Sequence, residues 1–562
     1  MPSTHLESDL RIPDLNTVRQ AIQFLFIVVT LSLISTSNSL AQSFDEDFSI
    51  WPIDLKINGV VIACSGPKVN QPVVDLFKRA AGKDSKIVAL WMDTEFKADS
   101  FEDVLGKDES TAFGKSDNSQ IDANKLKESL SDATGVLIFS SKPTSAKANK
   151  TLEVVQQDLK NVIQRGGVVC AVGPVISNLG AFRHDEVDSI SVIRKDLGLI
   201  PDGILYQSYV DDSDRQKMYG ALANKSHSVA IGVPEDTAIV LRGRKCITLG
   251  KQNVTFVITA NERQPYRIQH LADTTGKRIS PYKRVVDLTA WRRDAIERQL
   301  PAFPELKPPV PVVEKGTLFI VGGGGTPRGL MTEMVKLAGG KEAHMVYVPC
   351  TERETVPENH AVIRQWKRMG VASAKIFHTK DRNVANSDKE FLETMKEATG
   401  VWFGGGRQWN FADSYYGTEA HRLMKDVLAR GGVIGGSSAG ASIQGGYLAR
   451  ANPVANFDIM APGYERGLGF LPGVAIDQHF SQRGRQKDMT QLANRYPQLL
   501  GIGIDESTAI RVQGSTAEVI GNGKVFFYDR RKAVVPGEKD YLALSKGQSL
   551  DLQKREVVDD DQ

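Results

Sequence analysis

The stretch "HRLMKDVLARGGVIGGSSAGAS", residues 421–442, carries the pattern that decides the fold. Its first half repeats apolar residues at helical spacing and stops at Gly431 and Gly432, which predicts a helix that ends there. The apolar run at 433–436 then predicts a buried strand, and two serines follow in a turn of small residues. A helix that leads directly into a buried strand is typical of a parallel sheet covered by helices.

The same alternation continues outward from this stretch. "GTLFIVGGGG" from Gly316 predicts a strand that enters a glycine loop, "RGLMTEMVKLAGG" from Arg328 a helix, and "HMVYVPC" from His344 another strand. Ligands of such sheets bind beyond the carboxyl ends of the strands. We therefore expect functional side chains where these strands end.

The chain carries this pattern twice. "GVVIACSGPKVNQPVVDLFKRAAG" from Gly59 aligns without a gap with "GTLFIVGGGGTPRGLMTEMVKLAG" from Gly316, and "RGGVVCAVGPVIS" from Arg165 aligns with "RGGVIGGSSAGAS" from Arg430. Such internal similarity predicts two copies of one domain. The expected fold class is α/β, with two tandem doubly wound domains whose sheets are mostly parallel.

Proline-rich residues separate the two copies. "LPAFPELKPPVPVVEK", residues 300–315, predicts a stiff extended linker, because proline fixes φ and disfavours regular structure. The linker places the first copy at 42–299 and the second at 316–562. Just before it, the basic run "YKRVVDLTAWRR", residues 282–293, predicts a solvated surface.

The N-terminus differs from the rest of the chain. Arg11 and Arg19 precede the apolar run at 21–34, and small residues suited to cleavage follow up to Ala41. The run is shorter than the roughly 20 residues that a spanning helix needs. We expect a signal peptide at 1–41, export to the periplasm or the extracellular space, and no stable membrane span after cleavage. An uncleaved membrane anchor is the alternative.

The composition excludes several function classes. Lys plus Arg number 70 against 67 for Asp plus Glu, so no large positive excess is available to bind nucleic acid. The nine histidines form no metal-ligand motif, which predicts that no metal is bound. The cysteines match no zinc or redox spacing, and we expect buried thiols rather than disulfides. They are Cys64, Cys170, Cys246 and Cys350.

The turn "GSSAG" fits the G-x-S-x-G pattern, with Ser438 at its centre. A sharp strand-to-helix turn exposes such a serine as a nucleophile, whereas a phosphate-binding loop or a plain turn is the alternative for this motif alone. A nucleophilic serine needs a base and an acid. His479 follows the predicted strand "GVAID", and Asp505 and Glu506 both follow "GIGI", so either acid is a candidate on spacing alone.

Five motifs of the second copy resemble, in order, those of the cyanophycinases and the related aspartyl dipeptidases. They are "GGGG" from Gly322, "FGGGRQ" from Phe403, "GGSSAGAS" from Gly435, "DQHFSQRGR" from Asp477 and "GIGIDESTA" from Gly501. These families are serine peptidases with a class I glutamine amidotransferase-like fold. The resemblance extends from residue 316 to the C-terminus.

The resemblance implies a role for each matching residue. Ser438 would be the nucleophile, His479 the general base and Glu506 the third member of the triad. The backbone N–H of Ala439 and one from the loop of Gly405 and Gly406 would form the oxyanion hole. The substrate-binding positions would be Gln408, Asp477, Gln478, Arg483 and Arg485. Two departures, Arg407 and Asp488, reverse the charge usual in the family.

The resemblance also implies a substrate. The family cleaves cyanophycin, an aspartate backbone with arginine on each side-chain carboxyl, to β-Asp-Arg dipeptides. The chain is accordingly expected to be a serine-type peptidase that acts on Asp-rich peptides without a cofactor. The reversed charges leave an aspartyl dipeptidase or isopeptidase as an alternative. A binding protein with two inert halves is the alternative from another class.

The first copy lacks the residues that this chemistry needs. By alignment, Gly173 stands at the position of the nucleophile and Ser208 at that of the histidine, whereas Glu235 and Gln207 are retained. Pro143 stands at the position of Gln408. We expect this copy to be catalytically inert. Because family members are commonly dimers, we also expect the halves to pack as an intramolecular pseudo-dimer, with further association of chains left open.

Overall fold

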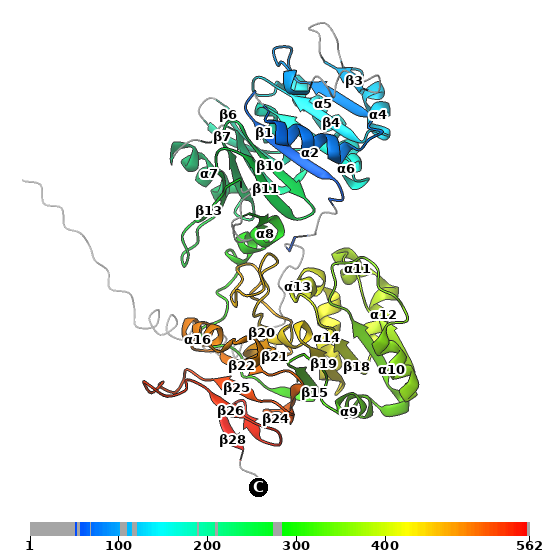
Figure 1. Ribbon diagram of the computed structural model, residues 1–562, viewed down its shortest axis with the longest axis vertical. Helices are drawn as coiled ribbons and strands as arrows, with labels where there is room; N and C mark the ends of the chain where they lie inside the picture. Colours follow the sequence, from blue (N-terminus) through cyan, green and yellow to red (C-terminus); the bar gives the residue numbers. More distant parts are fainter. Residues whose placement is uncertain are drawn as a thin grey trace, which may run out of the picture. The chain divides into compact units, whose positions relative to one another are not determined.

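The C-terminal half is built on a nine-stranded sheet with the order β17-β16-β18-β19-β15-β23-β24-β27-β28 (Figure 1). The first five strands in this order are parallel and the remaining pairings are antiparallel. Its strands are β15 (Val313–Val321), β16 (His344–Val348), β17 (Ser373–Ile376), β18 (Gly400–Phe403), β19 (Val433–Ser437), β23 (Thr508–Gly514), β24 (Thr516–Gly521), β27 (Ser549–Asp551) and β28 (Glu556–Val558). The architecture is mixed α/β, less parallel than the sequence predicts.

A second, five-stranded sheet completes this half, with the order β20-β21-β22-β25-β26. Its strands are β20 (Gly445–Tyr447), β21 (Leu471–Gln478), β22 (Leu500–Ile504), β25 (Val525–Tyr528) and β26 (Leu542–Leu544). The helices of the half are α9 (Leu330–Leu337), α10 (Ala361–Met369), α11 (Arg382–Ser387), α12 (Lys389–Glu397), α13 (Trp409–Tyr415), α14 (Glu419–Ala429), α15 (Ala439–Ser442) and α16 (Gln486–Arg495).

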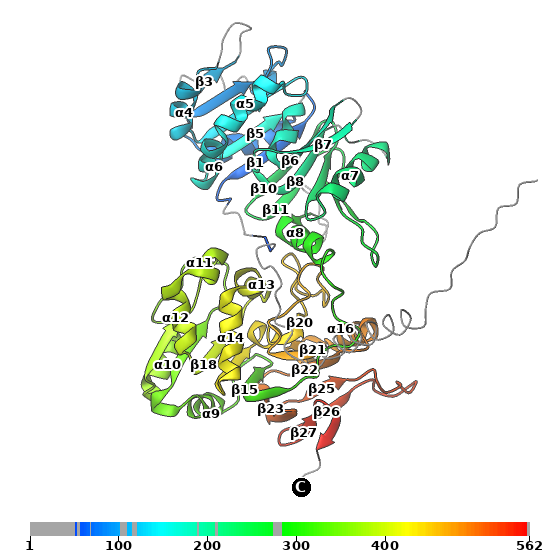
Figure 2. The same cartoon turned by 180° about the vertical axis from the view of Figure 1, so that it is seen from behind.

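The helix predicted to end at the glycine pair is α14. Its N-cap Thr418 accepts a hydrogen bond from the backbone N–H of His421, and the chain leaves the helix through Gly431 at φ 89°. The helix α14 packs on α12 and on strands β15 and β19 (Figures 1 and 2). After α14 the chain continues into β19, the buried strand that leads to the two serines.

The N-terminal half has an eight-stranded sheet, β14-β11-β10-β1-β5-β4-β2-β3, and a six-stranded sheet, β13-β12-β9-β8-β6-β7. The strands are β1 (Val60–Ser65), β2 (Ile87–Trp91), β3 (Ser110–Phe113), β4 (Gly135–Phe139), β5 (Val168–Val172), β6 (Gly180–Val187), β7 (Ile190–Lys195), β8 (Ile200–Gln207), β9 (Val229–Val233), β10 (Thr237–Arg242), β11 (Lys245–Gly250), β12 (Val254–Ile258), β13 (Arg267–Leu271) and β14 (Val286–Asp287). The helices are α2 (Gln71–Ala81), α4 (Ala123–Ser131), α5 (Ala146–Val154), α6 (Gln156–Gln164), α7 (Asp212–Asn224) and α8 (Leu288–Glu297).

The strands β1, β2, β4 and β5 of the eight-stranded sheet are buried on both faces, which explains their nearly continuous apolar runs. Alternate residues of β1 enter different cores: Val61 and Ala63 pack with α4 and α6, whereas Ile62 and Cys64 pack with α2. Counted from β3, the order of the first seven strands is β3-β2-β4-β5-β1-β10-β11. The C-terminal sheet begins β17-β16-β18-β19-β15-β23-β24, so strands at the same place in the two sheets also come in the same order along the chain. The shared order is what a repeat predicts; that the halves are copies stays a prediction.

The structure, a computed structural model, describes residues 51–52, 57–67, 69–101, 110–114, 121–187, 190–207, 209, 212–273 and 284–558. The predicted signal peptide at 1–41 and Ser208 lie outside these ranges. Within them, no helix is both long and apolar enough to cross a bilayer. All four cysteines are free thiols, and three of them are buried.

Two local predictions differ from the structure. The last residues of the predicted linker belong to β15, because Val313 is buried and pairs with Gly514 across the sheet. Residues 282–283 of the basic run lie outside the described residues, and the prediction of a solvated surface is wrong for the end of the run, which is buried. It enters α8, where Arg292 and Arg293 are only 6% and 1% exposed.

Candidate active site

Ser438 lies on a sharp turn between β19 and α15. Its backbone has φ 57° and ψ −113°, a sparsely populated conformation for a residue with a side chain. The backbone N–H of Ser438 donates to Val321 O over 3.0 Å, which ties the turn to the neighbouring strand β15. Strain of this kind is held by surrounding structure and collects at functional sites. The turn leaves the serine side chain partly exposed beyond the strand ends.

The structure brings Ser438, His479 and Glu506 into one hydrogen-bonded row. His479 follows β21 and Glu506 follows β22, so the three side chains come from the ends of three strands. Ser438 Oγ lies 2.9 Å from His479 Nε2, and Glu506 Oε1 lies 2.5 Å from His479 Nδ1. This is the geometry of a serine, a base and an orienting acid.

The imidazole of His479 is mostly buried, at 8% exposure. Burial lowers the pKa of His479, the hydrogen bond that its Nδ1 donates to Glu506 opposes that effect, and the charges of Arg483 and Arg485 lower the pKa further. The net direction is below the usual value for histidine. A neutral imidazole at neutral pH is free to accept the serine proton.

A glycine loop holds His479 and Glu506 in place. A Cβ on Gly323 would lie 2.3 Å from His479 Cε1, and one on Gly324 would lie 2.5 Å from Glu506 Oε2. Both glycines have positive φ, and the backbone N–H of His479 donates to Gly322 O over 2.7 Å. The close approach of Gly323 and Gly324 to the two triad side chains appears only in the structure. The loop's signal in the sequence was a run of four glycines directly after a buried strand.

The two acids after β22 have different tasks. Asp505 is buried, and its carboxylate accepts hydrogen bonds from the backbone N–H groups of Ser481 and Lys524 over 2.9 Å and 3.1 Å. Asp505 therefore fixes the segment after His479, and Glu506 is the acid that reaches the imidazole.

The residues expected to form the oxyanion hole lie near the serine. Ala439 is buried at the start of α15, and Gly405 is exposed. A Cβ added to Gly405 would lie 3.5 Å from Ser438 Cβ. Gly406 approaches Cys350 instead, since an added Cβ would lie 2.4 Å from Cys350 O. Backbone N–H groups in such positions stabilise a developing oxyanion when they point at it.

Two of the predicted substrate residues bind other parts of the protein. Asp477 is fully buried and accepts hydrogen bonds from Arg450 Nε over 2.8 Å and from Arg485 Nη1 over 2.8 Å. Gln408 is 3% exposed and donates to Ala449 O over 2.6 Å and to Arg450 O over 2.8 Å. A carboxylate or amide already satisfied inside the protein positions the site rather than contacting a ligand. In this structure Asp477 and Gln408 therefore support the site, and contact of either with a substrate stays a prediction.

Three predicted substrate residues keep that role as a prediction. Arg483 is exposed on the short helix after His479. Arg485 is 6% exposed, and besides Asp477 it donates to Gln478 O over 2.6 Å. Among the described residues, the buried Oε1 of Gln478 has no hydrogen-bond partner, which fits a group that awaits a ligand.

The two charge reversals have local explanations. Asp488 accepts a hydrogen bond from Arg450 Nη2 over 2.7 Å. Arg407 Nη2 donates to Asn452 O over 2.9 Å and Pro453 O over 3.3 Å. Both therefore hold the loop that joins β20 to β21.

Comparison with known proteins places this region among peptidases. The profile of Peptidase family S51 matches residues 318–520. The cyanophycinase of Geminocystis herdmanii (strain PCC 6308) is 30% identical over 195 residues, 34% of this chain and 71% of that protein. Peptidase E of Shewanella denitrificans is 23% identical over 152 residues, 26% of this chain and 63% of that protein. A solved peptidase from an acI-B1 Actinobacterium aligns over 42% of this chain and 97% of its own, at 23% identity and a TM-score of 0.34. The matched family region contains the whole row of Ser438, His479 and Glu506.

Proposed function

The chain belongs to peptidase family S51, a serine-type family, and from this premise we propose that its C-terminal half hydrolyses amide bonds with Ser438 as nucleophile. His479 acts as general base and Glu506 orients it. One observation carries the proposal: Ser438 Oγ, His479 and Glu506 form an unbroken row of contacts of 2.9 Å and 2.5 Å.

The reaction follows from this row. His479 Nε2 takes the proton of Ser438 as Oγ bonds to the substrate carbonyl carbon, and Glu506 stabilises the imidazolium that forms. The backbone N–H groups of Ala439 and Gly405 hold the oxyanion; losing one such donor typically costs about 10²–10³ in kcat. His479 then gives its proton to the departing amine. Water attacks the acyl-enzyme with His479 again as base, which restores Ser438.

The substrate class is a peptide rich in aspartate, and we take cyanophycin, cleaved to β-Asp-Arg, as the first candidate. The cyanophycinase relative supports this choice, as do the guanidinium groups of Arg483 and Arg485 beside the triad, since arginine pairs well with carboxylates. Arg407 and Asp488 favour the second candidate, an aspartyl dipeptidase or isopeptidase. They hold the β20–β21 loop with charges opposite to those that the resemblance leads us to expect in cyanophycinases.

Two assays test these proposals. A fluorophosphonate probe, followed by peptide mapping, should label Ser438 in the wild type and leave Ser438→Ala unlabelled. Absence of label in the wild type would favour a non-catalytic binding protein. Insoluble cyanophycin should release β-Asp-Arg. Cleavage of short aspartyl peptides without that release would favour the second candidate.

Three further parts of the proposal concern the whole chain. Residues 42–299 act as an inert copy that pairs with the active half as a pseudo-dimer, which the shared strand order supports. Residues 1–41 direct export to the periplasm or the extracellular space. N-terminal sequencing of the mature protein from the producing cell tests the last point, since a start at Gln42 is expected and retention of Met1 would contradict it.

A further inference from the structure

Two segments border the triad, and the protein ties them together. The first is α13 with the preceding residues Gly405–Gln408; the second is the loop at residues 448–470, which joins β20 to β21. Gln408 donates to two carbonyl groups of this β20–β21 loop, at Ala449 and Arg450. Arg450 in turn donates to Asp477, two residues before His479. The position of the loop is therefore coupled to the oxyanion segment and to the strand that carries the base.

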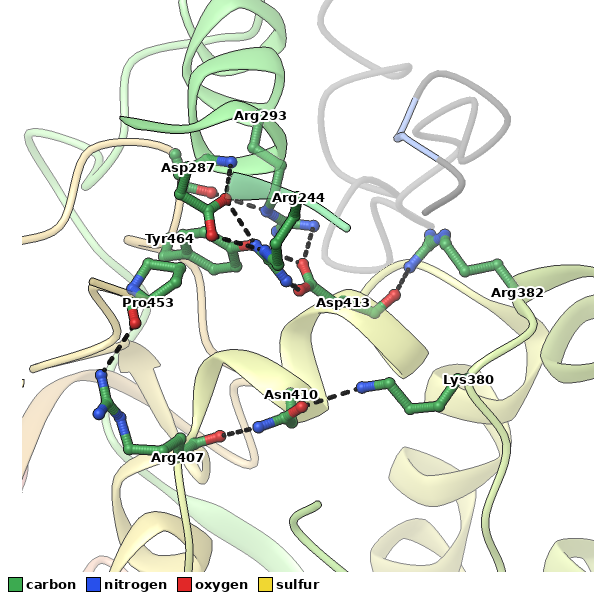
Figure 3. A network of polar contacts seen from close by, with 12 residues as sticks. Arg244, Asp287, Arg293, Lys380, Arg382, Arg407, Asn410, Asp413, Pro453 and Tyr464 are labelled. Atoms are coloured by element: carbon green, nitrogen blue, oxygen red, sulfur yellow. Dashed lines mark hydrogen bonds and ion pairs between the residues drawn. The ribbon is translucent and has the colours of Figure 1, made fainter. Parts of the chain in front are cut away.

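The N-terminal half reaches both segments through Arg244. Arg244 Nη1 donates to Asp413 Oδ2 of α13 over 2.6 Å, and its Nη2 donates to the hydroxyl of Tyr464 in the β20–β21 loop over 2.5 Å. Asp287 holds the same guanidinium through two contacts of 2.6 Å and 2.9 Å. Figure 3 shows the Arg244 guanidinium between Asp287, Asp413 and Tyr464.

A second arginine of the N-terminal half makes a parallel contact. Arg293 of α8 donates from Nε to Gly463 O over 2.8 Å, and its Nη1 lies 3.7 Å from Asp413 Oδ1. The loop approaches α8 so closely that a Cβ on Gly463 would lie 2.6 Å from Ala290 O. A tight, directional contact of this kind leaves the loop little freedom to shift.

The network is buried and charged. Arg293 is 1% exposed and Tyr464 is fully buried. Burial alone would raise the pKa of Asp413, but the charges of Arg244, Arg293 and Lys380 bring it below its usual value. Asp413 is thus an ionised carboxylate, and both arginines that pair with it come from the other half of the chain. Such a pair specifies one arrangement because the alternative is an unpaired buried charge.

We propose that Arg244 and Arg293 are positioning residues for the active site. By holding α13 and the β20–β21 loop together, the half that lacks the triad sets the geometry of residues 405–408, which precede α13, and of the β20–β21 loop, which is tied to Asp477 near His479. The inference rests on the proposed peptidase function. It assigns the N-terminal half a task in turnover, carried by named contacts.

The test uses full-length protein and three variants. Arg244→Met removes the contacts to both segments, and Tyr464→Phe removes only the hydroxyl and leaves no unpaired charge. Arg183→Met is the matched control, because Arg183 is similarly buried but pairs with Asp185 and Asp196 inside the N-terminal half. Turnover of a short aspartyl peptide amide is normalised to the number of sites labelled by a fluorophosphonate. This normalisation removes the effect of any unfolded fraction.

We expect kcat per labelled site to fall about tenfold in Arg244→Met and about threefold in Tyr464→Phe, within the range for residues that act through a coupled network. Arg183→Met should keep the wild-type value whatever its melting temperature. Wild-type kcat per site in both Arg244→Met and Tyr464→Phe would overturn the proposal, as would an equal loss in Arg183→Met.

A second measurement separates this proposal from the proposed function. Hydrogen exchange of residues 408–415 and 448–467 should be faster in Arg244→Met than in Arg183→Met, and it needs no catalysis. A wild type that neither turns over nor takes the label would defeat the peptidase assignment while the exchange result still tests the positioning contacts. Unchanged exchange in both segments would overturn the positioning role.

Discussion

The strand-to-helix turn occurs in both halves, and its chemistry differs between them. In the C-terminal half it presents Ser438, which is followed by Ala439, a residue with a backbone N–H, and lies near Gly405. At the aligned positions the N-terminal half has Gly173, followed by Pro174, which carries no N–H. The N-terminal turn therefore lacks both the nucleophile and one oxyanion donor.

The residue next to the N-terminal turn also leaves less space there than its counterpart in the C-terminal half. Ser140 stands where the other half has Gly405, and its hydroxyl accepts a hydrogen bond from the backbone N–H of Val175 over 2.8 Å. A Cβ on Gly173 would lie 1.9 Å from Ser140 O. Equivalent strand order thus does not preserve a site, because activity depends on a few atoms at the turn.

The largest expected effect concerns the two turns directly. Ser438→Ala should lower kcat by roughly 10⁶-fold, as loss of a triad serine does in other peptidases. Adding Gly173→Ser to that variant should not restore peptide hydrolysis. The new side chain would clash with Ser140, and the described residues place no histidine beside it. Peptide hydrolysis and probe labelling measure both. Recovery of either signal would break the comparison between the halves.

The acid of the triad gives the next largest effect. Glu506→Gln should lower kcat by about 10⁴-fold, because an amide no longer holds the imidazole in the correct tautomer. Asp505→Asn serves as the contrast, since Asp505 contacts backbone N–H groups and not His479. It should affect the melting temperature more than the chemical step. A larger loss of kcat in Asp505→Asn than in Glu506→Gln would reverse the assignment.

The glycine loops of the two halves offer a matched pair of substitutions. Gly323→Ala would place its Cβ 2.3 Å from the His479 ring, and we expect kcat/KM to fall about 10²-fold through displacement of the base. Gly66→Ala is the equivalent change in the N-terminal half, where the nearest atom is the flexible Glu235 side chain at 3.0 Å. Steady-state kinetics should show wild-type kcat/KM for it. Equal losses would mean that the first loop also supports catalysis.

The smallest expected effect is a shift in pH dependence. His479 must be neutral to act as base, so kcat/KM should be lost as the pH falls through its lowered pKa. Because the charge of Arg483 lowers that pKa, Arg483→Gln should move the acid limb to higher pH. The measurement is the midpoint of that limb, independent of the absolute rate. A shift to lower pH would contradict the electrostatic argument.

The candidate triad could be predicted from sequence because its members follow recognisable strands. Ser438, His479 and Glu506 each follow the end of a short apolar run, where ligands of such sheets bind. The sequence did not show that these strand ends come from two sheets, β19 from the nine-stranded sheet and β21 and β22 from the five-stranded sheet. The choice between Asp505 and Glu506 rested on resemblance. The structure adds its physical basis, since only Glu506 points at the imidazole and Asp505 is occupied by backbone donors.

The environment of buried charges could not be predicted in the same way. Arg293 lies in a basic run that reads as surface, yet it is buried because its partner Asp413 comes from a helix far along the chain. Asp477 matched a substrate position, yet Arg450 and Arg485 enclose it. The residues next to a charged side chain in the sequence do not indicate which ion-pair partner, far along the chain, will lie beside it in the fold.

Local periodicity was enough to predict which strands form and where they end. Motif spacing was enough to predict which half has a serine, a base and an acid at those ends. Which charged side chains lie in the site and which pair inside the surrounding structure could be seen only in the folded protein. The reason is physical: the state of a charged group depends on the partners that reach it in three dimensions, and for Asp413 and Tyr464 those partners include arginines of the other half.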